Sequence, residues 1–173
     1  LCDAAVECDE NPQIRAILIT AQGKYFSVGA DLKALGQDME KLPRWLKAAT
    51  ANLHMAIARF SRCDAPIVLA AHALVTGGAV ALTAMADFAL AAPEASFYAA
   101  YAGIGFASDG GGSYYLPRRV GSRRASEFLL LNQRWTAQQA EQYGLINRIV
   151  AAEALQAEAL QLAQQLARGP TRT

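Results

Sequence analysis

The segment from Ala65 to Asp87 constrains the fold more strongly than any other part of the sequence. The apolar run Ile67 to Ala71 follows a proline and has the composition of a buried strand. Thr76-Gly77-Gly78 interrupts the apolar pattern, and every residue from Gly78 to Ala86 is small or apolar, as in a helix that is packed on all sides. A strand that ends at paired glycines and continues into a helix leaves the first helical N–H groups unpaired.

Such N–H groups, together with the helix dipole, can stabilise an oxygen atom that gains negative charge. A second segment, Phe26 to Leu32, also follows a predicted strand and opens a predicted helix, so the backbone amide of Ala30 is expected to be free as well. Two amides, those of Ala30 and Gly78, could therefore hold one oxygen between them. The alternative interpretation of the paired glycines is a tight turn that needs positive φ or close packing.

Strands and helices alternate along the chain, which predicts the α/β class. Strands are predicted at 14–20, 67–71 and 87–91, near Phe97 and at 145–150. Helices are predicted at 1–10, 31–35, 41–62, 78–86, 122–131, 136–143 and 155–166, and 103–112 is predicted to be a glycine-rich loop. Ser122 and Thr136 are expected to cap the helices that they precede, and Gly144 to end the second of them.

The composition indicates a single globular domain over residues 1–173. Hydrophobic residues make up 53% of the chain and charged residues 18%, which excludes a disordered chain. The formal net charge of +1 argues against nucleic acid as a partner. Three scattered cysteines are too few for a disulfide framework or a metal site, which favours a reducing, cytoplasmic setting. No apolar run reaches transmembrane length, so no membrane partner is expected.

Several motifs resemble those of the crotonase superfamily, the enoyl-CoA hydratase/isomerase family, in the same order and spacing. Phe26-Ser27-Val28-Gly29-Ala30-Asp31-Leu32 resembles its Phe-x-Ala-Gly-Ala-Asp-Leu stretch, and Val75-Thr76-Gly77-Gly78-Ala79 resembles its Ala-Leu-Gly-Gly-Gly stretch. Ala95 to Phe97, Gly105, Leu116 to Gly121 and Ala140 to Val150 resemble later blocks. The resemblance covers nearly the whole chain.

This resemblance implies a crotonase-like (ClpP/crotonase) spiral of ββα units and an acyl-CoA thioester as substrate. Coenzyme A would enter as part of the substrate, with no permanently bound cofactor. The amides of Ala30 and Gly78 would form the oxyanion hole for the thioester enolate, and Lys33 matches a basic position that contacts CoA phosphate in some members. The family also implies a homo-oligomer, a trimer or hexamer, and a longer chain with additional N-terminal strands and C-terminal helices.

The hydratases of this family carry two glutamates that the sequence lacks. The matching positions hold Ala81, in the predicted buried helix, and Tyr101, just after the Phe97 strand. Neither side chain can move a proton to or from carbon as a carboxylate does. The two-glutamate hydratase mechanism is therefore not expected, and the single-glutamate isomerase mechanism loses its base as well.

A different carboxylate, Asp109, lies in the glycine-rich loop and is a candidate nucleophile or base. It falls where the 4-chlorobenzoyl-CoA dehalogenases of this superfamily carry a nucleophilic aspartate, and dienoyl-CoA isomerases also have an aspartate there. His54 matches the histidine base of the dehalogenases, and Tyr101 matches an aromatic residue that hydrogen-bonds their nucleophile. The plain alternatives are a loop aspartate that accepts backbone N–H bonds and a histidine on the surface of a helix.

Three functions remain open from the sequence. The first is a dehalogenase-like enzyme in which Asp109 is nucleophile or base, His54 activates water and Tyr101 supports the carboxylate. The second is a hydratase or isomerase that uses other acids. The third is a non-catalytic homologue that binds acyl-CoA or serves only in assembly. A basic cluster, Arg118, Arg119, Arg123 and Arg124, is interpreted as a solvated surface or a subunit contact.

Overall fold

The strands form two sheets that share the centre of the molecule. The structure, a computed structural model, describes residues 1–31 and 40–171. A four-stranded parallel sheet has the order β1 (Ile17–Ile19), β2 (Ile67–Ala71), β4 (Phe88–Ala91) and β7 (Arg148–Ile149). A three-stranded sheet has the order β3 (Val75–Thr76), β5 (Ser96–Tyr98) and β6 (Arg134–Thr136), in which β3 and β5 are parallel and β5 and β6 are antiparallel.

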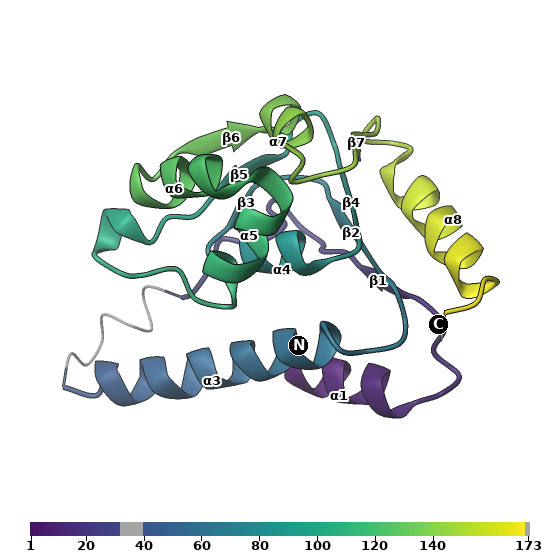
Figure 1. Ribbon diagram of the computed structural model, residues 1–173, viewed down its shortest axis with the longest axis horizontal. Coiled ribbons are helices and arrows are strands. Elements are labelled where there is room, and N and C mark those ends of the chain that lie inside the picture. Colours follow the sequence, from purple (N-terminus) through teal and green to yellow (C-terminus); the bar gives the residue numbers. More distant parts are fainter. Residues whose placement is uncertain (32–39, 172–173) are drawn as a thin grey trace.

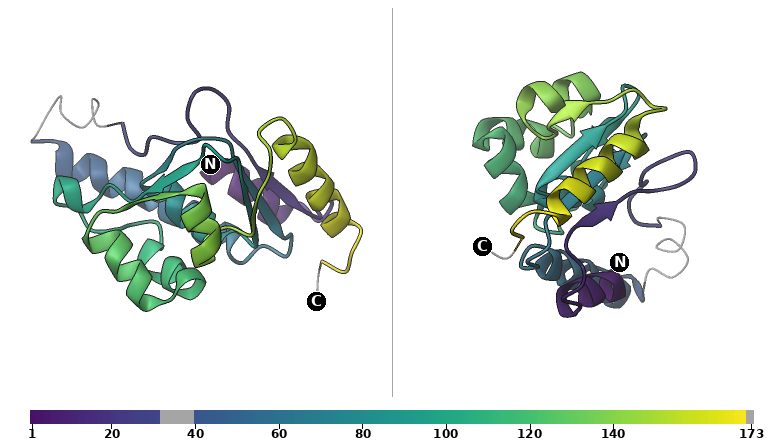
Figure 2. Two further views of the ribbon diagram at one scale, coloured as in Figure 1. Left: turned by 90° about the horizontal axis from the view of Figure 1, so that it is seen from above. Right: turned by 90° about the vertical axis from the view of Figure 1, so that its right-hand side faces the viewer.

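The helices surround these sheets on all sides (Figure 1). They are α1 (Cys2–Glu10), α3 (Leu42–Phe60), α4 (Gly78–Met85), the 3-10 turn η1 (Ala102–Ile104), α5 (Gly112–Val120), α6 (Ser122–Leu130), α7 (Ala137–Tyr143) and α8 (Leu155–Ala167). Helix α8 lies along one side of the four-stranded sheet, and α5, α6 and α7 lie on the other side (Figures 1 and 2). Helices α1 and α3 pack against each other below the sheets.

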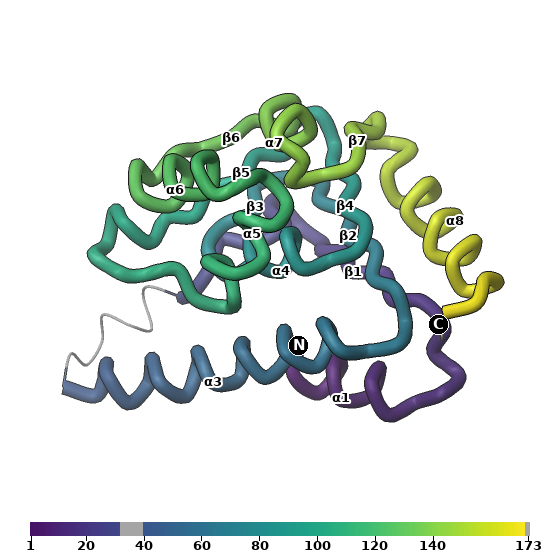
Figure 3. Tube along the Cα trace, viewed as in Figure 1, coloured from purple at the N-terminus to yellow at the C-terminus, as the bar shows by residue number. Residues whose placement is uncertain are grey.

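Two consecutive strands enter different sheets before α4 and again before α5. The chain runs β2, β3, α4 and then β4, β5, α5, so that one strand of each pair joins the four-stranded sheet and the next joins the three-stranded sheet. The tube in Figure 3 follows this path through two successive turns of the chain. This is the spiral of ββα units that the family resemblance implies, and it confirms the α/β class.

Strand β2 is buried on both faces, which explains its unbroken apolar sequence. Its alternate residues Ile67, Leu69 and Ala71 belong to the larger hydrophobic core, which extends to α3, α4 and α5. Val68 and Ala70 belong to a second cluster with α8, which contributes the buried residues Leu155, Ala159 and Ala163. Because successive strand residues face opposite sides, one short strand anchors both clusters.

The predicted elements differ from the observed ones mainly at their ends. The first strand covers 17–19 rather than 14–20, and the last covers 148–149 rather than 145–150. In parallel sheets the paired length depends on the neighbouring strand, so apolar residues beyond the paired region pack without joining the ladder. The predicted helix at 31–35 lies almost entirely outside the described residues.

Two strands and one α-helix were not predicted at all. Strands β3 and β6 are two and three residues long, too short for a periodic signal, and they exist because β5 pairs with both. Helix α5 contains Pro117 in its interior, which argues against a helix in the sequence. The packing of α5 on α4 and α6 holds that helix in place despite the proline.

The two predicted helix caps have different outcomes. The hydroxyl of Thr136 accepts a hydrogen bond from the Gln139 backbone N–H at 3.2 Å, and the Gln139 side chain accepts one from the Thr136 N–H at 3.0 Å, which completes a capping box. Gly144 ends the same helix with φ of 84°, as predicted. The prediction for Ser122 was wrong, since Gly121 holds the N-cap position and Ser122 is the first helical residue without a capping bond.

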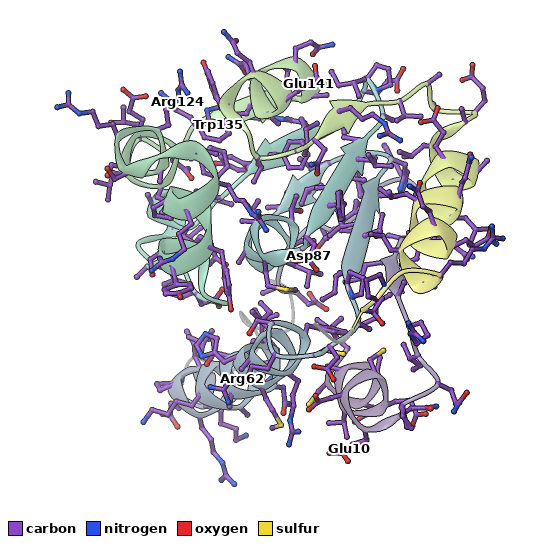
Figure 4. The ribbon with its side chains drawn as sticks, turned by 45° about the vertical axis from the view of Figure 1, so that its right-hand side comes forward. Glu10, Arg62, Asp87, Arg124, Trp135 and Glu141 are labelled. Atoms are coloured by element: carbon purple, nitrogen blue, oxygen red, sulfur yellow. The ribbon has the colours of Figure 1, made fainter. Side chains whose placement is uncertain are left out.

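Part of the basic cluster serves contacts within the chain rather than a free surface. Arg119 donates to the carbonyl oxygens of Ala84 and Ala86 at 2.8 and 2.7 Å, where it satisfies the last turn of α4. The guanidinium of Arg124 lies 4.4 Å from the centre of the Tyr143 ring. Figure 4 labels Arg124 close to Trp135, in the region where α6 meets α7. Arg119 therefore joins α5 to α4, and Arg124 joins α6 to α7.

No helix in the described ranges combines the length and the apolar character that are needed to cross a bilayer.

Candidate functional site

A cavity of about 710 Å³ lies between α3, the start of α4 and the turn that follows β5. This volume is typical of a small-molecule site. Four predicted site residues, Ala30, Gly78, Tyr101 and Asp109, are among the residues that line it. Asp109 is the only ionisable acid, and no histidine, lysine or arginine occurs, among the described residues of the lining.

The segments that contain Gly29 and Gly77 lie side by side in the wall of this cavity. Ser27 forms a parallel bridge with Val75, and the Thr76 N–H donates to the Ser27 carbonyl at 3.0 Å. Gly77 has φ of 63°, and a Cβ atom added there would lie 3.5 Å from the Cα of Gly29. The contact distance would admit a Cβ atom, so it is the positive φ that favours glycine at position 77.

The backbone N–H groups of Ala30 and Gly78 are the predicted donors of the oxyanion hole. Gly78 begins α4, and within the described residues neither its N–H nor that of Ala30 donates a hydrogen bond. The neighbouring Gly77 N–H donates to the Tyr98 carbonyl at 3.0 Å, so this turn is fixed by a different amide. A free amide at the start of a buried helix favours negative charge near it.

The loop that carries Asp109 is pressed against α3 and α4. Gly110 is buried with φ of 57°, and a Cβ atom added there would lie 3.0 Å from Cδ1 of Ile57 and 3.4 Å from Cβ of Ala81. A larger residue would lift the loop from the two helices. The tight packing brings Oδ1 of Asp109 to 3.7 Å from where a Cβ of Gly78 would lie.

The hydroxyl of Tyr101 donates a hydrogen bond to Oδ1 of Asp109. Burial, followed by this hydrogen bond and the charge of Asp109, raises the pKa of Tyr101 well above its usual range. The phenol therefore keeps its proton and remains a donor at neutral pH. The second carboxylate oxygen, Oδ2, has no hydrogen-bond partner in the described part of the chain.

The comparisons with known proteins identify the family of the chain. The family model described as enoyl-CoA hydratase/isomerase matches residues 1–173. The chain belongs to the enoyl-CoA hydratase/isomerase family. It is 31% identical over 170 residues to 4-chlorobenzoyl coenzyme A dehalogenase-1 of an Arthrobacter species, covering 98% of this chain and 62% of that relative.

Other members of the enoyl-CoA hydratase/isomerase family show the same partial coverage. The chain is 33% identical over 162 residues to carnitinyl-CoA dehydratase of Citrobacter koseri, covering 91% of this chain and 59% of the relative. The crystal structure of an enoyl-CoA hydratase from a Polaromonas species superimposes with a TM-score of 0.89 at 30% identity, covering 98% of this chain and 66% of that one. The chain thus spans about three fifths of the length of these curated relatives.

Ala81, at one of the two positions where the family's hydratases carry glutamate, is buried and does not line the cavity. A Cβ atom added at Gly110 would lie 3.4 Å from the Cβ of Ala81, and one added at Gly112 would lie 3.7 Å from it. The glycine loop therefore lies beside Ala81. In this family member the loop brings Asp109 toward the cavity instead.

His54 is not brought to the cavity. It is exposed on α3 and absent from the residues that line the cavity, although its neighbour Leu53 lines it. The α3 side chains that face the cavity recur at positions 45–46, 49–50 and 53, and His54 lies outside this face. The proposed CoA-binding residue Lys33 lies outside the described residues. Among the described residues no cluster of histidine, cysteine and acidic side chains could hold a metal ion.

Sequence reasoning missed the apolar wall of the cavity. The apolar side chains of α3 fall into two groups, because Ala56, Ile57 and Phe60 are buried in the core whereas Leu46 and Leu53 line the cavity. Trp45, Ile104 and Phe106 line the cavity as well and are exposed there. Exposure of large apolar side chains around a cavity is typical of a ligand site, but a sequence does not show which part of a stripe is covered.

Proposed function

We propose that this family member acts on an acyl-CoA thioester and uses Asp109 as its reactive carboxylate. One observation carries the proposal: the free amides of Ala30 and Gly78 and the carboxylate of Asp109 line one apolar cavity. The dehalogenase and dehydratase relatives bear the names of CoA-thioester enzymes. Coenzyme A would be part of the substrate, and the proposal requires no other cofactor.

In this proposal the thioester carbonyl oxygen binds between the Ala30 and Gly78 amides. Charge that develops on this oxygen would be stabilised by the two N–H donors and by the dipole of α4. The apolar walls from α3 and the 102–109 segment would keep water away, which strengthens these electrostatic interactions. The acyl group would extend from the amides past Gly78 toward Asp109.

Asp109 can act in two ways at this position. As a base, it would take a proton from a carbon of the acyl group, and the electron pair would move to the thioester oxygen as an enolate. As a nucleophile, a carboxylate oxygen would bond to a ring carbon of an aryl acyl group, the thioester oxygen would take up the charge, and a leaving group would depart. Water would then cleave the resulting ester. In either role, the hydrogen bond from Tyr101 would fix the orientation of the carboxylate.

We assign no step to His54, because the structure places it on the exposed side of α3. In the nucleophilic route, water activation would then need another group. A His54→Gln variant that retains full turnover is the expected result. If His54→Gln still formed the ester on Asp109 but could no longer hydrolyse it, His54 would be assigned to water activation.

Turnover of an acyl-CoA panel by the parent chain and by Asp109→Asn tests the proposed function. Substrates with aryl, enoyl and saturated acyl groups should be followed by product chromatography, with binding measured in parallel. We expect the parent chain to turn over at least one of these substrates and Asp109→Asn to turn over none. Binding without turnover by the parent chain would instead support the non-catalytic alternative.

A further inference from the structure

Tyr98 is a second tyrosine among the residues that line the cavity. In β5 the preceding residue, Phe97, is fully buried in the core, so Tyr98 faces the opposite side of the three-stranded sheet. It pairs in register with Thr76, and both residues line the cavity. Residues that pair in register share a face of a sheet, so the cavity side of β5 is the side of the Tyr98 side chain.

The Tyr98 hydroxyl is held by Asn132. The Nδ2 atom of Asn132 donates to it at 2.7 Å, and Asn132 has a positive φ of 54°, a conformation that asparagine adopts more readily than most residues. The turn η1 packs over this pair, since a Cβ atom added at Gly103 would lie 2.8 Å from Nδ2 of Asn132 and 3.8 Å from the Tyr98 hydroxyl. The pair is therefore fixed from the strand, from the end of α6 and from η1.

The two phenols of the cavity differ in what they can still donate. Tyr101 already donates its hydrogen bond to Asp109. Tyr98 accepts from Asn132, and within the described residues its hydroxyl donates to no partner, which leaves its proton for a ligand. The cavity wall also includes the apolar side chains of Leu53 and Phe106. A ligand that accepts a hydrogen bond from Tyr98 would therefore carry one acceptor atom on an otherwise apolar group.

We propose that Tyr98 determines acyl specificity by donating a hydrogen bond to an acceptor on an apolar, aryl-sized acyl group. The inference rests on the proposed function and names its substrate class: an uncharged acyl group with one hydrogen-bond acceptor distant from the thioester. An anionic acyl group does not fit, since no histidine, lysine or arginine occurs among the described residues of the lining. Asn132 is a positioning residue for the Tyr98 hydroxyl.

Binding of matched acyl-CoA pairs tests this inference. Each pair consists of meta- or para-substituted benzoyl-CoA ketone analogues that differ only in a hydroxyl against a methyl group, with a methylene in place of the thioester sulfur so that the analogue cannot be hydrolysed. Calorimetry should show that the parent chain binds one hydroxyl analogue more tightly than its methyl partner by about 2- to 12-fold, the range of a single neutral hydrogen bond. Tyr98→Phe should bring this ratio close to one.

Asn132→Asp provides an independent variant that keeps a residue suited to positive φ. Its carboxylate would accept the Tyr98 proton and leave only the Tyr98 oxygen to accept a hydrogen bond from the analogue, so the hydroxyl-to-methyl affinity ratio should differ from the parent value. Tyr25→Phe, at an exposed tyrosine outside the cavity, should keep the parent ratio.

The outcomes separate the two proposals. Equal affinity of the parent chain for every hydroxyl and methyl partner, with measurable binding of both, overturns the role of Tyr98 and leaves the acyl-CoA function intact. A preference that survives in Tyr98→Phe also overturns it. Failure of the parent chain to bind any of these analogues, or CoA thioesters in general, would count against the proposed function itself.

Discussion

The phenol of Tyr101 donates a hydrogen bond to Asp109 across the turn that leads from β5 to the glycine loop. The two residues are eight positions apart, and the intervening turn η1 folds back so that the Phe106 N–H donates to the Tyr101 carbonyl at 3.0 Å. This turn places a carboxylate where a cavity, a helix start and an apolar wall converge. The predictions below follow from this arrangement.

Asp109→Asn should lower kcat by about 10²- to 10⁴-fold, the usual contribution of a positioned acid or base. The amide keeps the size of the carboxylate and can still accept from Tyr101, so acyl-CoA affinity should stay within a few-fold of the parent value. Stopped-flow turnover and calorimetric binding measure the two effects. Isolation of an acyl fragment attached to Asp109 after rapid quenching would select the nucleophilic role, and parent-level turnover of Asp109→Asn would exclude both roles.

Gly78→Pro should lower kcat by about 10²- to 10³-fold, because it removes one N–H donor of the proposed oxyanion hole. Proline is tolerated at the first helical position, where Gly78 lies. Gly78→Ala is the matched control, since its Cβ meets Cδ2 of Leu53 at the same 2.7 Å but its N–H remains. Equal activity of the two variants, with circular dichroism showing both folded, would mean that the Gly78 amide does not stabilise the transition state.

Tyr101 should make the stability of the parent chain fall at alkaline pH. Its pKa is raised above the ordinary tyrosine value of about 10, so below pH 10 both the folded and unfolded states hold the proton and the contribution is complete. Above pH 10 the unfolded state releases this proton while the folded state keeps it, and the free energy of unfolding declines by up to about 1.4 kcal/mol per pH unit.

Urea unfolding at several pH values between 9 and 11 measures this slope. Tyr101→Phe should have a shallower slope than the parent chain by the contribution of one proton. Tyr25→Phe, at an exposed ring, should not remove the part of the slope that Tyr101 causes. Identical slopes for the parent and Tyr101→Phe would mean that the phenol is not protected from deprotonation.

Thr136→Ala should lower the free energy of unfolding by about 1 kcal/mol, since it removes the side-chain cap of α7. For a chain of this size, that change corresponds to a decrease in Tm of about 2–4 °C. Ser122→Ala should change Tm by much less, because Ser122 makes no capping bond. Differential scanning calorimetry compares the two variants, and an equal decrease in both would contradict the assignment of the caps.

We also predict that the chain forms a homo-oligomer, a trimer or a hexamer. Leu130 and Leu131 at the end of α6 are 75% and 68% exposed, and two adjacent leucines so open to water favour burial against another subunit. Light scattering should give a mass that is a threefold or sixfold multiple of the 18.5 kDa chain. A single-chain mass at micromolar concentration would be the contrary result.

The sequence by itself determined the elements whose residues repeat a local pattern. The apolar run of β2, the small-residue helix α4, the amphipathic helices α3 and α8, and the Thr136 cap depend on neighbours close in the chain, so their patterns are visible without tertiary structure. Paired glycines before α4 also indicated a free amide at Gly78, because the first N–H groups of any helix lack partners within that helix. The α/β class and the ββα spiral followed from these elements and from the family motifs.

Only the tertiary structure decided which of these residues meet. Strands β3 and β6 exist through pairing with β5, and helix α5 persists around Pro117 because α4 and α6 pack on it. His54 and Leu53 are adjacent in sequence, yet a helix turns successive side chains by about 100°, so only Leu53 lines the cavity. The pairing of Tyr98 with Asn132 joins residues 34 positions apart, and no local pattern predicts such a contact, because the folded backbone alone sets the distance between them.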